Sequence, residues 1–276
     1  MRVRVAIAGA VIGTTAGVAL SRVVRWWRTW GIDASETARE LPGDGLIAEP
    51  TAIETRGLTI DAPPEAVWPW LVQMGYGRAG WYSYDRMDMR GRSAVGLVPA
   101  WQTLVVGDRV GTGPGTGFEV RLVEPNRALV LYLDTALVTA QMEAKQAAET
   151  AGQATPAGLA ASGAMLRATP PEFAASWAFS LEPVDGGRTR LIERLRYRTE
   201  AAAPAQRLAV GLLGFGVFLM TQRQMRGIRE RAERTVVAPP VVTEMAPESA
   251  ETTITPVATS DAPPMKGSHR IATAVG

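Results

Sequence analysis

The sequence predicts an α+β fold in which an antiparallel sheet is closed by one long helix. Strand-like segments follow one another in quick succession, as in an antiparallel meander. A helix is expected after the first strand, because Val67, Trp70, Leu71 and Met74 follow one another at helical spacing. One long helix, from about Gln206 to Arg234, ends the domain. Strands packed against helices in this order are typical of α+β domains.

Each expected strand shows either an alternation of apolar and polar residues or a short apolar run. Phe118, Val120 and Leu122, for example, share one face of their strand. Asp185-Gly186-Gly187 predicts the turn between the last two strands. The expected strands are Ile53–Ile60, Gly107–Val110, Phe118–Glu124, Leu129–Leu133, Phe173–Glu182 and Thr189–Thr199.

Prolines mark where the first helix begins. In Asp61-Ala62-Pro63-Pro64 a proline falls in the first helical turn, where its missing amide hydrogen costs nothing. Pro69 lies inside the segment and should kink or shorten the helix. Trp81-Tyr82-Ser83-Tyr84-Asp85 is expected to open a second short helix, and a further helix is expected near Ala136 to Ala151.

The chain divides into a folded part and ends of different composition. Residues 1–30 are expected to form a membrane anchor helix with an interfacial belt, and residues 31–50 a polar connector. The domain is expected to span residues 51–234, interrupted at residues 135–172 by a mobile insertion rich in Ala, Gly, Thr and Gln. Residues 235–276 are rich in Pro, Thr, Ala and Glu, which predicts a disordered tail.

Composition excludes several kinds of chemistry. The formal charge of +2 over 276 residues gives no reason to expect a nucleic-acid partner. The chain has no cysteine, which excludes disulfides, thiolate nucleophiles and cysteine-bound metals. Its one histidine, His269, lies in the expected disordered tail, which excludes a Ser-His-Asp triad and a histidine-bound zinc. No metal or other cofactor is expected, and any catalysis would depend on carboxylates or tyrosines.

An uncharged run of 17 residues, from Val5 to Ser21, predicts a membrane helix. At about 1.5 Å per residue it is roughly 26 Å long, just short of a bilayer core. Trp26, Trp27 and Trp30 alternate with arginines directly after it, as in an interfacial belt. A retained single-pass anchor is the favoured interpretation, and a cleaved signal peptide or a soluble helix are the alternatives. The flanking arginines favour a domain on the cytoplasmic side of the cell membrane, although the N-terminal amine offsets their small excess.

Gly9, Gly13 and Gly17 recur every fourth residue and so share one face of this expected helix. Such a face lets two membrane helices approach closely, and a homodimer through these glycines is one hypothesis. The alternative is that the spacing arises by chance in a helix rich in Ala and Gly.

A strand that runs into a helix start, Ile60-Asp61-Ala62-Pro63-Pro64-Glu65-Ala66-Val67-Trp68, is the first of several motifs. The others are Trp81-Tyr82-Ser83-Tyr84-Asp85, Val106-Gly107-Asp108, Ser176-Trp177-Ala178-Phe179, Gly187-Arg188-Thr189-Arg190-Leu191 and the closing segment 225–233.

In this order the motifs resemble the START/Bet v1-like superfamily, also called SRPBCC or polyketide-cyclase-like proteins. They look like an uncharacterised, actinobacterial-type, membrane-tethered branch of it. The resemblance covers about Ile53 to Glu233, apart from the insertion. It implies a helix-grip fold, in which a curved antiparallel sheet wraps around a long C-terminal helix and leaves a cavity for an apolar ligand. Functions in this superfamily range from lipid carriage to cyclisation, so the fold does not settle the activity.

The expected cavity wall consists of apolar and aromatic residues on the inner faces of the strands and on the first helices. A packed core uses the same residue types and is the alternative, but the resemblance favours a cavity. The expected lining residues are Met74, Trp81, Tyr84, Phe118, Val120, Tyr132, Trp177, Phe179, Leu195 and Tyr197.

The glycines of the segment 75–80 have the spacing of a dinucleotide fingerprint. That fingerprint requires a strand before it and a helix after it, whereas here an expected helix precedes the glycines. The segment is therefore interpreted as a flexible turn near the cavity mouth.

Glu193 is the polar residue whose position suggests function. Alternation places it on one face of its strand with Leu191, Leu195 and Tyr197. A carboxylate on an apolar face has a raised pKa unless it is paired, which makes Glu193 a candidate for ligand binding or proton transfer. A position at a sheet edge or bulge is the alternative. The opposite face is expected to be solvated and carries Arg190, Arg194, Arg196 and Arg198.

Asp85 and Tyr82 are the other acid–base candidates, because they lie in an aromatic segment expected at the cavity. A helix-capping role is the alternative for Asp85.

The last helix is expected to have two parts. Leu208 to Met220 is apolar on all sides, whereas an amphipathic pattern begins at Arg223. Thirteen residues cannot span a bilayer, so burial under the sheet is expected for the apolar part. Membrane contact near Gly211 to Phe218 is the alternative.

Three functions follow from the sequence. The first is a membrane-tethered protein that binds a lipid, isoprenoid or polyketide-like molecule in an internal cavity. The second is an enzyme performing cyclisation, dehydration or hydrolysis by carboxylate or tyrosine acid–base chemistry. The third is a non-catalytic membrane scaffold.

Overall fold

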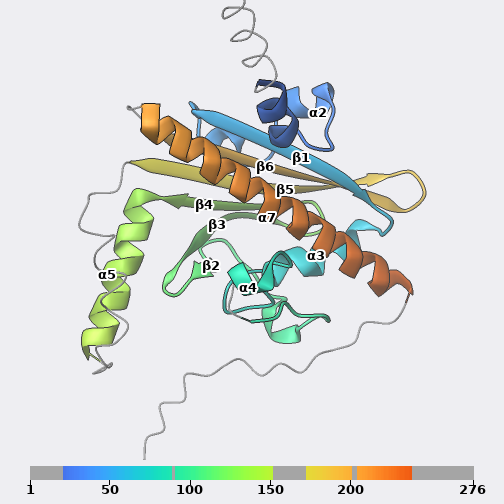
Figure 1. Ribbon diagram of the computed structural model, residues 1–276. Coiled ribbons are helices and arrows are strands. Elements are labelled where there is room, and N and C mark those ends of the chain that lie inside the picture. Colours follow the sequence, from blue (N-terminus) through green and yellow to red (C-terminus); the bar gives the residue numbers. More distant parts are fainter. Residues whose placement is uncertain (1–20, 89–90, 152–171, 201–203, 238–276) are drawn as a thin grey trace, which may run out of the picture.

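The computed structural model describes residues 21–88, 91–151, 172–200 and 204–237. They form a six-stranded antiparallel sheet in the order β1-β6-β5-β4-β3-β2, and the long helix α7 (Pro204–Val237) runs diagonally across it (Figure 1). The expected α+β fold, with a curved antiparallel sheet and a long C-terminal helix in the helix-grip arrangement, is confirmed.

The strands lie close to their expected positions. The largest difference is at β2, which begins two residues later than expected and continues into the glycine-rich segment. There it forms a hairpin with β3 that closes between Gly113 and Thr116. The strands are β1 (Ala52–Ile60), β2 (Arg109–Gly113), β3 (Thr116–Glu124), β4 (Ala128–Asp134), β5 (Phe173–Val184) and β6 (Arg188–Thr199).

The strand register brings charged residues together on the inner face of the sheet, which is the face toward α7. Glu193 on β6 lies opposite Arg56 on β1 and opposite Phe179 on β5. Glu54 lies two residues before Arg56 and therefore on the same face, opposite Leu195. Two acidic side chains and one basic side chain thus share a face that is otherwise apolar.

The first helix of the connection between β1 and β2 is α3 (Pro64–Val72), and it is shortened as expected. Pro63 occupies the N-cap position, and the helix ends three residues after Pro69. Trp70 and Leu71 of α3 are buried in the core beneath α7. The rest of the connection contains the one-turn helix α4 (Asp85–Asp88), at the expected position, and the 3-10 turn η2 (Pro99–Trp101).

The C-terminal half of α7 packs tightly against the loop that follows α3. A Cβ atom added at Gly227 would lie 2.3 Å from the carbonyl oxygen of Tyr82, so a glycine permits this approach. One turn later, the guanidinium of Arg231 lies over the Tyr82 ring at 4.6 Å, and its Nε donates a hydrogen bond of 2.9 Å to the carbonyl oxygen of Ala94. These contacts fix one end of α7 to the body of the domain.

The segment that precedes β1 covers the outer face of the sheet with the short helix α2 (Ala34–Ala38) and the 3-10 turn η1 (Asp44–Leu46). Arg194, expected on a solvated face, is only 3% exposed, so that expectation was wrong. Its guanidinium donates to Asp44, to Thr55 and to the carbonyl oxygens of residues 36, 37 and 39. The segment expected to be a connector thus packs on the sheet, because arginines of β6 provide its hydrogen-bond donors.

Helix α5 (Thr135–Ala151) follows β4 directly and lies beside the ends of strands β4 and β3 (Figure 1). The side-chain amide of Gln141 on α5 exchanges two hydrogen bonds, of 2.9 and 3.0 Å, with the backbone of Gly117 on β3. The first part of the expected insertion is therefore a helix attached to the sheet.

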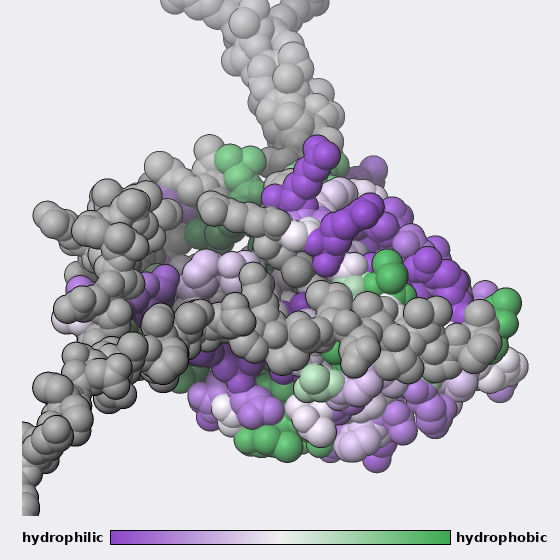
Figure 2. Space-filling view, turned by 90° about the horizontal axis from the view of Figure 1, so that it is seen from below, coloured by the Kyte–Doolittle hydropathy of each residue, from purple (hydrophilic) through white to green (hydrophobic). Residues whose placement is uncertain are grey.

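Several expectations concern residues outside the described part of the chain. They are the membrane helix before Ser21 with its glycines Gly9, Gly13 and Gly17, the insertion beyond residue 151, and the tail beyond residue 237. Among the helices that the structure does describe, none combines the length and the apolar character needed to cross a bilayer. On the face of the domain seen in Figure 2, opposite the N-terminal segment, the described residues that are visible are mainly hydrophilic, and the apolar ones form separate small groups.

Candidate functional site: a cavity beneath helix α7

A cavity of about 710 Å³ lies between the inner face of the sheet and α7. Residues of α7 reach it at spacings of three and four, which places them on one helix face. Strands β1 to β6 and the loop after α3 supply the rest of the wall. The lining residues are Glu54, Trp81, Ser83, Thr112, Phe118, Leu133, Phe173, Ala175, Trp177, Leu195, Tyr197, Arg198, Thr199, Val210, Leu213, Gly214, Val217, Met220, Thr221 and Gln224.

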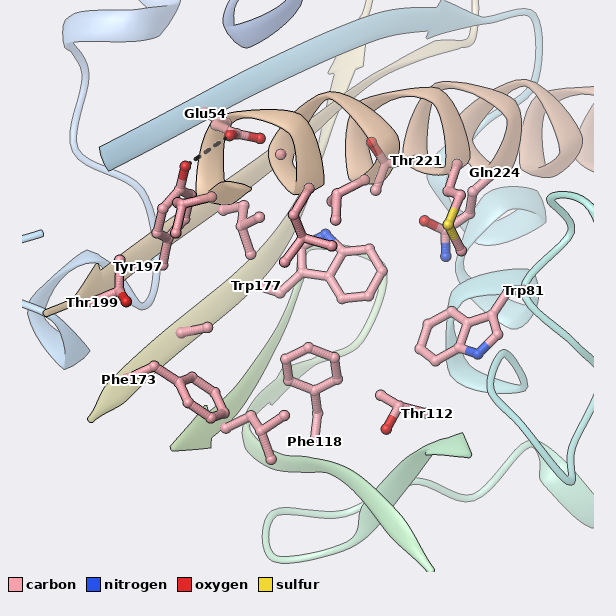
Figure 3. Close-up of a pocket in the computed structure, with 18 of the residues that line it drawn as sticks. Glu54, Trp81, Thr112, Phe118, Phe173, Trp177, Tyr197, Thr199, Thr221 and Gln224 are labelled. Atoms are coloured by element: carbon pink, nitrogen blue, oxygen red, sulfur yellow. Dashed lines mark hydrogen bonds between the residues drawn. The ribbon is translucent and has the colours of Figure 1, made fainter. Parts of the chain in front are cut away.

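Trp177 of β5 occupies the centre of the wall (Figure 3). Its ring stacks on Trp81 with centroids 5.4 Å apart and 20° between the planes, and contacts Phe118 at 5.5 Å. Phe179 follows it on the same face, with a centroid distance of 5.1 Å. The aromatic rings therefore hold one another in place, which gives this side of the cavity a fixed shape.

The cavity is closed at one end and reaches the surface at the other. Trp177 and Gln224 are at most 9% exposed, whereas Leu213 of α7 is 69% exposed and also lines the cavity. The expectation that Leu208 to Met220 is buried under the sheet was therefore wrong. The cavity separates this half of α7 from the sheet, and the outer side of the helix is uncovered, with Leu212 67% exposed.

A buried charged cluster lies beside the cavity, between β1, β6 and α7. Arg56 is fully buried and forms a salt bridge with Glu54 on its own strand. It donates hydrogen bonds to Thr221 (2.9 Å) and to the Trp27 carbonyl oxygen (3.2 Å), and its Nη1 lies 3.8 Å from Oε1 of Glu193. One guanidinium thus serves two buried carboxylates.

The protonation of this cluster follows from its burial. Burial raises the pKa of Glu193, and the nearby Arg56 only partly opposes this effect. Burial also raises the pKa of Glu54, against the salt bridge to Arg56 and the hydrogen bond of 3.2 Å that the Tyr197 hydroxyl donates. Tyr197 keeps its proton, since burial and the adjacent carboxylate raise its pKa to about 12. A single proton shared by the two carboxylates would make the cluster neutral.

Of the ten residues predicted to line the cavity, five do so and five do not. Trp81, Phe118, Trp177, Leu195 and Tyr197 line the cavity. The other five do not reach it: three are fully buried in the core, Tyr84 is 45% exposed, and the Tyr132 ring lies under the Arg121 guanidinium. The three core residues are Met74, Val120 and Phe179.

None of the three acid–base candidates lines the cavity. Glu193 is buried on the inner face, as alternation indicated, but its Oε1 accepts a hydrogen bond of 2.7 Å from Trp177, the residue that does line the wall. Tyr82 is buried against α7 and accepts a hydrogen bond from Gln73 (3.1 Å). Asp85 accepts a hydrogen bond of 2.5 Å from Ser93. Within the described residues, no group of acidic or histidine side chains is arranged to hold a metal ion.

Two members of the charged cluster, Glu54 and Arg56, were missed by the sequence analysis. The signal was present, because both share a strand face with Leu58 and Ile60, which are buried. The alternation argument that selected Glu193 selects these two residues as well.

No family model matches the chain, and no curated protein matches it. A solved structure of a protein from Mesorhizobium loti is similar to it, with 18% identity, a TM-score of 0.34, and coverage of 67% of this chain and 98% of that chain. The Zhui aromatase/cyclase from Streptomyces sp. R1128 is similar with 14% identity, a TM-score of 0.30, and coverage of 67% and 95% of the two chains. Ara h 8.0201 is similar with 14% identity, a TM-score of 0.28, and coverage of 67% and 97%. The fold assignment rests on the strand order and the path of α7 themselves.

Proposed function

We propose that this protein binds a hydrophobic small molecule, such as a lipid, an isoprenoid or a polyketide-like compound, in the cavity beneath α7. The observation that carries the proposal is a cavity of about 710 Å³ whose wall is mainly aliphatic and aromatic. Pockets for small molecules commonly have this size and character, with few polar groups on the wall.

The charged cluster is compatible with an apolar ligand because its members are bonded to one another. Glu54, the one carboxylate on the cavity wall, is held by Arg56 and Tyr197. Polar groups that are already hydrogen-bonded need no water from the cavity. An apolar ligand can therefore enter without leaving these side chains unpaired.

Phenanthrene, a rigid apolar probe, tests the proposal. The full chain is placed in lipid nanodiscs, with protein-free nanodiscs as the blank for partition into lipid. We expect saturable quenching of tryptophan fluorescence, because Trp81 and Trp177 line the cavity. Ala175→Phe should remove most of this saturable signal, since Ala175 also lines the cavity and a phenyl ring would occupy its space.

Ala144→Phe is the matched control, because Ala144 lies on an exposed part of α5. It should bind phenanthrene like the unchanged chain. Equal binding by the Ala175→Phe variant, or no saturable binding by the unchanged chain, would contradict a ligand site in this cavity.

We further propose that the cavity mouth faces a membrane. Leu212, Leu213 and Phe215 of α7 are exposed, and the helical residues 21–28 pack beside them, with Trp26 and Phe218 ring centroids 5.4 Å apart. Trp26 is itself 56% exposed. An exposed apolar surface of this kind is unusual unless something covers it.

A bilayer is the occupant favoured by the sequence around this surface. The uncharged run of 17 residues predicted to be a membrane anchor ends at Ser21, where the described helix begins. Arg22 and Arg25 are exposed on that helix next to the tryptophans, an arrangement suited to lipid headgroups. A ligand could then pass between lipid and cavity past Leu213.

The chain has no cysteine, so a single introduced cysteine can carry a fluorescent label for testing this placement. In the full chain reconstituted in vesicles, a label at Leu213→Cys should be quenched by nitroxide lipids. A label at Ala144→Cys, on the exposed side of α5, should be quenched by a water-soluble quencher instead. Equal access of the water-soluble quencher to both labels would rule out membrane contact at the mouth.

A further inference from the structure

One polar group on the cavity wall lacks a partner. Gln224 of α7 is 2% exposed and lines the closed end of the cavity, and its Oε1 accepts no hydrogen bond. Its Nε2 is placed 3.6 Å from the sulfur of Met74, which is a weak acceptor. Five side-chain atoms in the described residues are buried without a partner, and Gln224 alone among their residues lines the cavity.

The neighbouring polar groups on the wall are already bonded. The Thr221 hydroxyl, one turn earlier on α7, accepts from Arg56 and donates to the Phe218 carbonyl oxygen. The Ser83 hydroxyl donates a hydrogen bond of 2.9 Å to the Met220 carbonyl oxygen. In Figure 3 the Gln224 side chain extends from α7 into the cavity, toward the end where Trp81 lies. A buried acceptor in such a position is costly when it is left unpaired.

We propose that Gln224 is the polar recognition residue of the cavity and that the ligand is an apolar molecule carrying an uncharged hydroxyl group. This inference rests on the proposed function. The hydroxyl donates to Oε1 of Gln224 while the apolar body of the ligand lies along Trp81 and Trp177. Hydrogen bonding to a buried side-chain amide selects against an analogue that lacks the donor, because the amide then stays unpaired.

The charges around the cavity disfavour an anionic ligand. Arg56 is already engaged by Glu54, Glu193 and Thr221, so it has no capacity left for a ligand carboxylate. An additional anion would lie near two buried carboxylates whose pKa values are already raised by burial. Arg198, the one cationic residue on the wall, is exposed at the opposite end. An uncharged donor at Gln224 meets neither difficulty.

A matched pair of probes tests the inference. Phenanthrene and 9-phenanthrenol differ by one hydroxyl group, and both are titrated into the full chain in nanodiscs, with protein-free nanodiscs as the blank. The unchanged chain should bind the phenol about five to ten times more tightly after correction for partition. Gln224→Met, which keeps the length of the side chain and removes the amide, should abolish this preference without weakening phenanthrene binding.

Gln146→Met is the matched control, since it makes the same substitution at an exposed position of α5 that does not line the cavity. It should keep the preference for the phenol. A melting experiment without probe adds an independent readout: Gln224→Met should melt no lower than the unchanged chain, because its unpaired amide has been replaced by an apolar group.

The outcomes separate the inference from the proposed function. If both probes bind the unchanged chain equally, or if Gln224→Met keeps the preference, the role of Gln224 is refuted while the apolar cavity stands. If neither probe binds, the proposed function fails and the inference fails with it. A clear loss of thermal stability in Gln224→Met would show that the amide has a structural partner, which also refutes the inference.

Discussion

Arg56 is predicted to be the side chain on which the buried charged cluster beside the cavity depends most. It is fully buried and holds Glu54, Thr221 and the carbonyl oxygen of Trp27. Arg56→Met keeps most of the apolar stem but leaves two buried carboxylates without a cation. Removing one partner of a buried ion pair costs about 3–5 kcal/mol. For a domain of this size, that is a fall in melting temperature of roughly 6–20 °C.

The loss of stability in Arg56→Met should increase as the pH rises. Arg56 lowers the pKa values of Glu54 and Glu193, so its removal raises both further. Both carboxyl groups then have a higher pKa in the folded state than in the unfolded state. Such a group stabilises the fold at low pH, and this stabilisation is lost as the pH rises through the pKa of the folded state. Arg56→Met should therefore be close to the unchanged chain near the ordinary pKa of a glutamate and much less stable at pH 8.

Urea unfolding of the full chain, followed by tryptophan fluorescence at pH 5 and pH 8, measures both effects. Arg229→Met is the matched control, because this arginine is exposed and its ion pair with Glu233 has a separation of 4.0 Å. The control should change the free energy of unfolding by less than about 1 kcal/mol at either pH. A loss below about 1 kcal/mol for Arg56→Met at pH 8, or an equal loss at both pH values, would contradict the proposed role of Arg56.

Three further predictions concern other parts of the molecule. Glu193→Gln should flatten the pH dependence of stability and raise the melting temperature at pH 8 relative to pH 5, because the group with the raised pKa can no longer ionise. Differential scanning fluorimetry measures this, and a pH curve parallel to that of the unchanged chain would contradict it. Gly227→Ala should lower the melting temperature, since the added Cβ would lie 2.3 Å from the Tyr82 carbonyl oxygen. Alanine by itself favours helices by about 1 kcal/mol over glycine, so an increase in melting temperature would show that the contact with Tyr82 relaxes freely. Arg194→Met should make the segment around Asp44 more sensitive to limited proteolysis, because four hydrogen bonds from Arg194 hold this segment to β6, and an unchanged cleavage pattern would argue against this attachment.

Period-two alternation predicted the inner face of the sheet well. It placed Glu193 among apolar residues, where it is 1% exposed. The same rule applied to β1 identifies Glu54 and Arg56, so the signal for these two residues is present in the sequence. The sequence could not show that these side chains meet, because their contacts depend on the register of β1 against β6.

Two other expectations failed because they concern what covers a surface. Arg194 lies on the outer face of β6, as alternation indicated, but residues 33–47 fold back over that face. Nothing in the local pattern of β6 reveals this covering segment. Leu212 and Leu213 lie in a part of α7 that was expected to be buried. Instead, the cavity lies on the inner side of this part of the helix, and its outer side is uncovered. Periodicity identifies a face, whereas the partner of that face is set by tertiary packing.

The presence of an apolar ligand in the cavity beneath α7 can be tested by identifying the compounds that the purified protein retains. The full chain and its Ala175→Phe variant are purified in parallel, extracted with organic solvent and compared by quantitative mass spectrometry. We expect an apolar compound with a hydroxyl group, close to one per chain in the unchanged protein and strongly depleted in the variant. Equal amounts of the same compounds in both samples would contradict it.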